Sequence, residues 1–248
     1  MAMRRIYRID GTAPRPSRLA IAHAAADLSR GALALLPTET VYGVGVAVSA
    51  FAGDGPDRDE LPDEGSGYRR IFSLKRRDLA QTVPWLVSGI EALDIHGVDV
   101  DPRVRALAEA FWPGALTIVV KAAPSVPAFM RAADGTVALR ASASPVILAL
   151  TRACSSPLAV TSANTHGRPA PASFSAVEPR VLNGVDLAID AGETVCRDAS
   201  TIVSFVSGQL EILRAGALAT AEIEEALARM AGGSPDATPH RADGPIQP

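Results

Sequence analysis

The sequence predicts a single α/β domain built on a mixed β-sheet. Strand-like apolar runs alternate irregularly with helix-like stretches along most of the 248 residues, without an internal repeat. Hydrophobic residues make up 48% of the chain and charged residues 21%, a balance typical of a globular protein with a sizeable core. Because aromatic residues account for only 4%, we expect valine, leucine, isoleucine and alanine to fill that core.

Apolar periodicity and capping residues predict the individual elements. A helix is expected to begin near Pro16 and Ser17 and to end at Gly31, because its apolar positions lie three and four residues apart. Further helices are expected at 102–111, 145–152 and 220–230, with Asp101 and Thr220 as capping residues. Strands are expected at 5–9, 32–36, 44–48, 116–121, 137–140, 158–161, 187–189, 201–206 and 210–213.

Two segments differ in composition from the rest. Glycine, proline, aspartate and glutamate dominate residues 53–68, which we interpret as an exposed insertion inside the domain. Residues 231–248 are rich in glycine and proline, and we expect a disordered tail there. The sequence therefore predicts one domain over residues 1–230.

Charge and cysteine usage restrict the class of protein. A net charge of −3 gives no overall attraction to nucleic acid or anionic membranes, so a polyanion would need a local basic cluster. Cys154 and Cys196 could form one disulfide, but two thiols in a chain of this size fit a reducing compartment better. Apolar runs stay shorter than a membrane span, and the histidines are not grouped at ligand spacing. We therefore expect a cytoplasmic protein without a structural metal.

A cationic triplet, Lys75-Arg76-Arg77, follows an apolar segment. It could be a phosphate clamp, because arginine offers forked donors and lysine a point charge. It could equally be a solvated helix face, which is the commoner role of such a triplet. Its place between apolar segments, directly after the insertion, favours the clamp.

Small polar side chains lie at the ends of two predicted strands. Thr38 and Thr40 follow the strand at 32–36, and Ser162 and Asn164 follow the strand at 158–161. Strand ends are where ligands bind in open α/β sheets, yet hydroxyl and amide groups also satisfy ordinary turns. In isolation the threonines fit a turn better, and the second pair fits either role.

Two arginines, Arg140 and Arg214, each end an apolar strand. A cation in that position needs a partner, which could be an anionic ligand or a neighbouring carboxylate. His166 lies in the same polar region and could act as a general base, although a surface loop histidine is the simpler interpretation.

Taken in order, these segments resemble the YrdC-like family of threonylcarbamoyl-AMP synthases, in its short, single-domain form. The resemblance runs from about Arg30 to Gly216. Its elements are PTETVYGVG at 37–45, KRR at 75–77, FWPGALTIVV at 111–120, TVALR at 136–140, SAN at 162–164 with Gly167 and Pro169, STI at 200–202 and RAG at 214–216.

The resemblance implies a twisted mixed sheet, flanked by helices and curved around a basic cavity. It also implies a nucleotidyltransferase that converts L-threonine, bicarbonate and ATP into threonylcarbamoyl-AMP and pyrophosphate, for the threonylcarbamoyl-adenosine modification of tRNA. Mg²⁺ would accompany ATP, without an assigned protein ligand. The partners implied are a downstream tRNA-modifying transferase and, weakly, RNA.

The same resemblance implies roles for individual residues. By similarity, the residues that hold threonine would be Thr40, Arg140 and Ser200, with Arg140 facing the carboxylate. Those that hold ATP would be Lys75, Arg77, Thr136, Ser162, Asn164 and Arg214, of which Lys75 and Arg77 would be catalytic.

The chain departs from the family pattern at several positions. Ser88 stands where many members have a histidine, Asp78 replaces the proline that follows the cations, and Ser142 replaces the proline of the usual Arg-x-Pro. These departures leave a first alternative, a paralogue that acts on another amine or carbamoyl substrate. A second alternative is a non-catalytic RNA-binding protein of the same fold. The strand-end arginines and small hydroxyls favour a small-molecule pocket over this second alternative.

Overall fold

The computed structural model describes residues 5–10, 13, 16–52 and 59–232. Its α-helices are α1 (Arg18–Ser29), α2 (Gly67–Lys75), α3 (Ala92–His96), α4 (Pro102–Phe111), α5 (Pro145–Cys154), α6 (Pro179–Asn183) and α7 (Thr220–Gly232). Its strands are β1 (Arg5–Arg8), β2 (Ala34–Pro37), β3 (Tyr42–Ala47), β4 (Trp85–Val87), β5 (Gly97–Val98), β6 (Leu116–Ala122), β7 (Thr136–Ala141), β8 (Leu158–Ser162), β9 (Leu187–Asp190), β10 (Thr201–Ser204) and β11 (Glu211–Arg214).

All of these strands join one mixed sheet in the order β1-β9-β2-β3-β8-β4-β7-β6-β10-β11, with β5 beside β6. Four pairs are parallel, namely β1–β9, β9–β2, β4–β7 and β6–β10, and the other pairs are antiparallel. The predicted α/β fold with a mixed sheet flanked by helices is confirmed.

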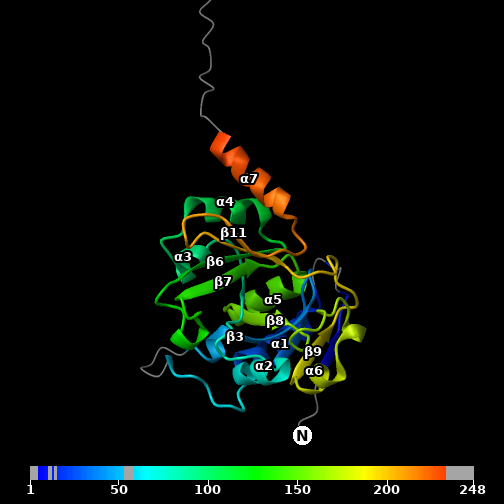
Figure 1. Cartoon of the computed structure of the whole chain (residues 1–248). Helices are drawn as coiled ribbons and strands as arrows, with labels where there is room; N and C mark the ends of the chain where they lie inside the picture. The colour runs from blue at the N-terminus through cyan, green and yellow to red at the C-terminus, as the bar shows by residue number, and fades with distance from the viewer. Residues whose placement is uncertain (1–4, 11–12, 14–15, 53–58, 233–248) are drawn as a thin grey trace, which may run out of the picture.

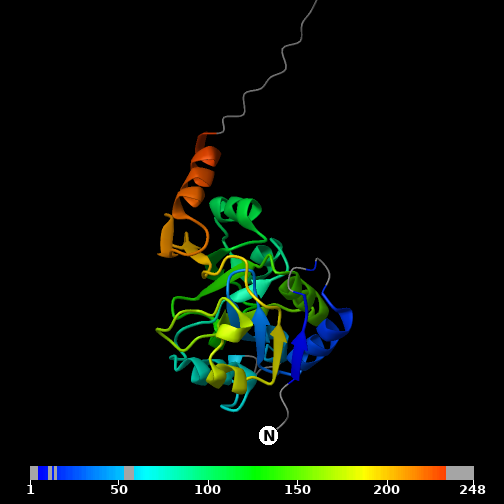
Figure 2. The ribbon, with the colours of Figure 1, turned by 90° about the vertical axis from the view of Figure 1, so that its right-hand side faces the viewer.

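Helices cover both faces of the sheet (Figure 1). Alternate residues of a strand point to opposite faces, and accordingly Leu35 belongs to one core and Leu36 to the other. The helices α1 and α5 pack together over one face. The other face is covered by α2, α3, α4 and α6, and α7 packs against α4 at the end of the molecule far from α2 (Figure 2).

Local capping explains where several helices begin. The Ser17 hydroxyl accepts the backbone N–H of Ala20, and the Asp101 carboxylate accepts that of Arg103. The predicted helices and strands are all present, with boundaries shifted by a few residues at most. The short elements β4, β5, α3 and α6 were not predicted, because two to five residues carry too little periodicity. The helix α2 was not predicted either, because its first two residues were assigned to the insertion.

The predicted exposed insertion at 53–68 is wrong at its C-terminal end. Gly67 and Tyr68 already belong to α2, and Tyr68 is only 1% exposed. Its ring packs edge-on against Phe72 and Phe129, so an aromatic contact made across the fold orders this end. Residues 53–58, and the tail prediction over 233–248, lie outside the described residues, while Gly232 ends α7.

Candidate active site

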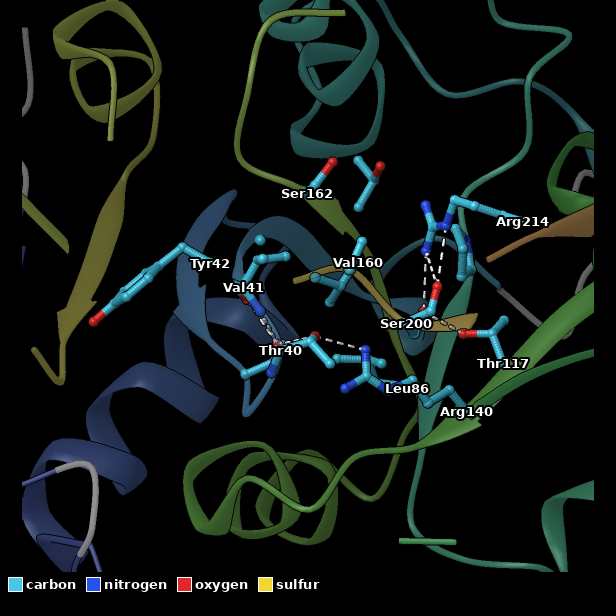
Figure 3. Close-up of a pocket in the computed structure, with 15 residues that line it drawn as sticks. Thr40, Val41, Tyr42, Leu86, Thr117, Arg140, Val160, Ser162, Ser200 and Arg214 are labelled. Atoms are coloured by element: carbon cyan, nitrogen blue, oxygen red, sulfur yellow. Dashed lines mark hydrogen bonds between the residues drawn. The ribbon is translucent and has the colours of Figure 1, made fainter. Parts of the chain in front are cut away.

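A pocket opens on the sheet face that carries α5, and we call it the inner pocket (Figure 3). It encloses about 500 Å³, part of which is open to solvent. Strands β4, β7 and β8 contribute Leu86, Arg140 and Val160, and the β2–β3 connection closes one side. Its polar lining comes from Thr38, Thr40, Thr117, Arg140, Thr161, Ser162, Ser200 and Arg214.

A second, larger depression adjoins the inner pocket, and we call it the outer groove. It shares Thr161, Ser162 and Arg214 with the inner pocket. The groove adds two cations, Lys75 and Arg77, and further lining residues, which are Ala80, Gln81, Thr82, Asn164, His166, Ile202 and Leu213. The two hollows therefore form one continuous site, with hydroxyls and one arginine at one end and a cluster of cations at the other.

Arg140 is held rigidly at the inner pocket. Its guanidinium donates from Nε to the carbonyl of Gly114 at 2.9 Å, from Nη1 to Thr40 Oγ1 at 3.0 Å and from Nη2 to Glu39 Oε1 at 2.5 Å. The side chains of the Arg140–Glu39 ion pair are 6% and 10% exposed. The strand-end cation thus does have a neighbouring carboxylate, and two of its five N–H groups remain for a ligand.

The threonines of the β2–β3 connection have different tasks. The hydroxyl of Thr38 accepts the backbone N–H groups of Thr40 and Val41 and donates to the Val41 carbonyl. This is turn chemistry, as the simpler interpretation of the sequence expected. The hydroxyl of Thr40 lies 2.8 Å from Thr38 Oγ1 and accepts from Arg140 Nη1. Thr38 donates to the Val41 carbonyl, so the Thr40 hydroxyl donates to Thr38 and has one lone pair left to accept from a ligand in the inner pocket.

Thr117 is a site residue that the sequence interpretation missed. Its Oγ1 lies 2.8 Å from Ser200 Oγ, and both line the inner pocket. Arg214 in turn donates to the carbonyl and hydroxyl of Ser200 (Figure 3). Burial first, and then the nearby charge of Arg140, lower the pKa of Arg214. Thr117 belongs to the FWPGALTIVV segment, which contributes to the family resemblance, but no role was assigned to any residue of that segment.

Thr136, which the family resemblance assigns to ATP, lies away from both hollows. Its hydroxyl donates to Asp134 Oδ1 at 2.7 Å, and it pairs with Lys121 at the opposite end of β7 from Arg140. It lines neither the inner pocket nor the outer groove. Because β6 and β7 are antiparallel, with Ile118 opposite Leu139, it is Thr117 that lies beside Arg140.

Lys75 is buried at the outer groove, only 4% exposed. Its ammonium donates to the carbonyl oxygens of Ser162 and Asn164, at 2.5 and 2.9 Å, and lies 3.2 Å from Asn164 Oδ1. These acceptors are neutral. Burial first, and then the charge of Arg77, lower the pKa of Lys75 to about 8, while Glu178 opposes the shift. The site thus holds a cation at some energetic cost, which a bound anion would offset.

The other two members of the cationic triplet lie in different environments, Arg77 in the outer groove and Arg76 at the surface. Arg77 donates to Thr161 Oγ1 and to the Thr82 carbonyl, and its Nε is buried without a partner among the described residues. Burial lowers the pKa of Arg77. Arg76 is exposed, with a left-handed φ of 51° at the end of α2, so the solvated-surface interpretation holds for this residue alone.

Of the other candidates, His166 lies exposed in the loop after β8, and its backbone N–H donates to the Lys75 carbonyl. Ser88 is exposed after β4 and lines neither the inner pocket nor the outer groove. Both cysteines are free thiols. Within the described ranges, no helix is long and apolar enough to cross a membrane.

The side chains of the site do not form a metal-binding set. In the described part of the chain, no group of three or more histidine, cysteine, aspartate or glutamate side chains could hold a metal ion. Glu39, the carboxylate nearest Arg140, is occupied by this ion pair and by Ser142. The polar groups that face the outer groove are mainly cations, hydroxyls and amides, which suit an anion.

Comparison with known proteins places the chain in a family. The Sua5/YciO/YrdC family model, described as telomere recombination, matches residues 61–216. The threonylcarbamoyl-AMP synthase of Xanthomonas campestris is 31% identical over 188 residues, which cover 72% of this chain and 92% of that protein. The chain belongs to the Sua5/YciO/YrdC family.

Other members of the family extend this similarity. The threonylcarbamoyl-AMP synthase of Pyrococcus abyssi is 31% identical over 204 residues, or 82% of this chain and 56% of that longer protein. The crystal structure of P. abyssi Sua5 complexed with L-threonine superposes with a TM-score of 0.77 and 29% identity, over 94% of this chain and 65% of that one. Escherichia coli YciO, with a TM-score of 0.70 and 19% identity over 87% and 96% of the two chains, shares the fold.

Proposed function

We propose that this chain is a threonylcarbamoyl-AMP synthase, a nucleotidyltransferase that acts on L-threonine, bicarbonate and ATP. The observation that carries the proposal is the continuity of the site. A pocket lined by hydroxyls and Arg140 opens into a groove lined by Lys75, Arg77 and Arg214. Relatives of that name at 30% identity or more over most of the chain support the same reaction over a paralogous one.

The inner pocket would hold the amino acid. The free N–H groups of Arg140 suit the threonine carboxylate, because a guanidinium forms paired, charge-assisted hydrogen bonds with carboxylates. Thr40, Ser200 and Thr117 offer hydroxyls for the amine and side-chain hydroxyl of the substrate. The pocket is small, which suits an amino acid rather than an RNA chain.

The outer groove would hold ATP. The threonine amine and bicarbonate first combine to a carbamate with loss of water. A carbamate oxygen then attacks the α-phosphorus, the bond between the α-phosphorus and the bridging oxygen breaks, and pyrophosphate leaves. No protein nucleophile takes part. Lys75, Arg77 and Arg214 would neutralise the phosphate charge, and Ser162 and Asn164 would orient the phosphates.

Mg²⁺ would be bound through the phosphate oxygens of ATP, since the described residues offer no acidic ligand set. It would supply further neutralisation of the phosphate charge. The product would pass to a tRNA-modifying transferase in the cytoplasm. Any RNA contact would be weak and salt-dependent, because the net charge of the chain is −3.

Pyrophosphate release tests the proposal directly. The purified protein is incubated with Mg-ATP and bicarbonate, with and without L-threonine, and the nucleotide product is identified by mass spectrometry. We expect release that depends on threonine and yields threonylcarbamoyl-AMP. Clear ATP binding without threonine-dependent release would overturn the threonine assignment and direct the search to other amines. Salt-dependent RNA binding without nucleotide affinity would overturn the enzymatic assignment altogether.

A further inference from the structure

Glu39 contacts Arg140 from outside the inner pocket. Its Oε1 accepts from Arg140 Nη2, whereas Arg140 and Thr40 line the pocket and Glu39 does not. The carboxylate is therefore not aimed at the space that a ligand would occupy. A carboxylate placed there does not compete with an anionic ligand for the same N–H groups, but limits the directions in which the guanidinium can turn.

A short serine segment holds Glu39 in turn. The Ser142 hydroxyl donates to Glu39 Oε2 and accepts the backbone N–H of Ser144 at 3.2 Å. The Ser144 hydroxyl donates to the carbonyl of Pro37 at 3.0 Å. Both serines are buried, at 3% and 5% exposure. The segment that follows β7 is thus tied to the end of β2 through Ser144 and to the β2–β3 connection through Ser142.

We propose that Glu39 and Ser142 are positioning residues for substrate binding, which act through Arg140. With Nε on the Gly114 carbonyl and Nη2 on Glu39, the guanidinium plane is held in one orientation where Arg140 lines the inner pocket. The proposal rests on the proposed function, because it assigns the substrate carboxylate to Arg140. The hydrogen bond from the Ser142 hydroxyl to Glu39 requires a hydroxyl side chain, because a proline at position 142 has no group that could donate it. This support of Glu39 is therefore a feature of this chain.

The kinetic consequence is specific to one substrate. A loosened Arg140 holds the amino-acid carboxylate less well, while Lys75 and Arg77 contact the nucleotide independently. We therefore expect Glu39→Gln to raise the KM for threonine about tenfold, as expected when a charged partner becomes neutral, and to leave the KM for ATP unchanged. Ser142→Ala should also raise the KM for threonine, because Glu39 loses a hydrogen bond that holds it. The rise should be smaller, about threefold, because Glu39 keeps its contact with Arg140.

The experiment measures pyrophosphate release for both variants against each substrate in turn. Glu193→Gln is the matched control, because it neutralises a glutamate in an exposed ion pair, with Arg197, outside the site. Far-UV circular dichroism and thermal denaturation show whether each variant folds; Glu39→Gln conserves the shape of the side chain. Equal rises in both KM values, or no rise in either, would overturn the proposal.

A second readout does not depend on turnover. In nitrogen-15 NMR, the Arg140 Nε–H signal, assigned by its loss in Arg140→Lys, should be sharp and exchange slowly in the wild type. It should broaden in Glu39→Gln and stay unchanged in Glu193→Gln. An Arg140 signal indifferent to Glu39→Gln would overturn the positioning role. A different outcome is a sharp Arg140 signal that depends on Glu39, in a protein that does not release pyrophosphate in response to threonine. That outcome would overturn the proposed function and leave the positioning role supported.

Discussion

Lys75 provides a test of the site that needs no substrate. Replacing Lys75 with methionine keeps an unbranched side chain of similar length and removes the charge. In the wild type Lys75 is 4% exposed, and its ammonium donates to neutral oxygens of Ser162 and Asn164. Burial lowers its pKa from 10.5 to about 8. The folded protein therefore holds this charge less favourably than the unfolded chain does.

The size and sign of the effect follow from proton linkage. Between about pH 8 and 10.5 the unfolded chain binds more protons at Lys75 than the folded protein does, so this group increases stability as the pH rises. A shift from 10.5 to about 8 corresponds to about 3 kcal/mol in total, of which about 2–3 kcal/mol is gained between pH 7 and pH 10. Lys75→Met lacks this gain.

Urea denaturation of both proteins at pH 7 and pH 10 measures the effect. The free energy of unfolding of the wild type, minus that of Lys75→Met, should rise by about 2–3 kcal/mol from the lower to the higher pH. Lys121→Met is the matched control, since these are the two lysines of the chain and Lys121 is exposed. A difference that stays constant with pH would refute the burial of a charged Lys75. Threonine-dependent pyrophosphate release by Lys75→Met at the wild-type rate would refute its role at the phosphates.

Three further predictions concern two parts of the site and the packing of β3. Arg140→Met should lower the free energy of unfolding by about 3–5 kcal/mol in urea denaturation, because it leaves the buried carboxylate of Glu39 without its cationic partner. It should also abolish saturation of the pyrophosphate release by threonine. Thr117→Val should raise the KM for threonine in the pyrophosphate assay, whereas Thr136→Val should leave the KM values for threonine and ATP unchanged. The reverse result would restore the sequence-based assignment of Thr136 to the site. Gly45→Ala would place its Cβ 2.4 Å from a backbone oxygen of β8 and should destabilise the protein by about 2 kcal/mol or more in thermal denaturation, while Gly65→Ala, with open space around it, should not.

The elements that position the site were predictable where local signals are strong. β6 and β8 appear as runs of apolar residues, and the polar groups of Ser162 and Asn164 follow directly in the chain. β4 was not predictable, because three residues give no periodicity, yet its pairing with β7 places Leu86 beside Arg140. The burial of Tyr68 was hidden for a related reason, since its aromatic partner Phe129 lies far away in the sequence.

The sequence by itself determined the fold class and the family resemblance, and it predicted most of the residues that line the candidate site, because those signals lie in short segments. Only the tertiary structure decided that Thr117 rather than Thr136 adjoins Arg140, that Glu39 holds Arg140 from outside the pocket, and that Lys75 is buried. The physical reason is that spacing along a strand fixes which face a side chain occupies, whereas its neighbours across the sheet depend on strand order and register. Register is set by pairing between distant segments, which no local pattern records.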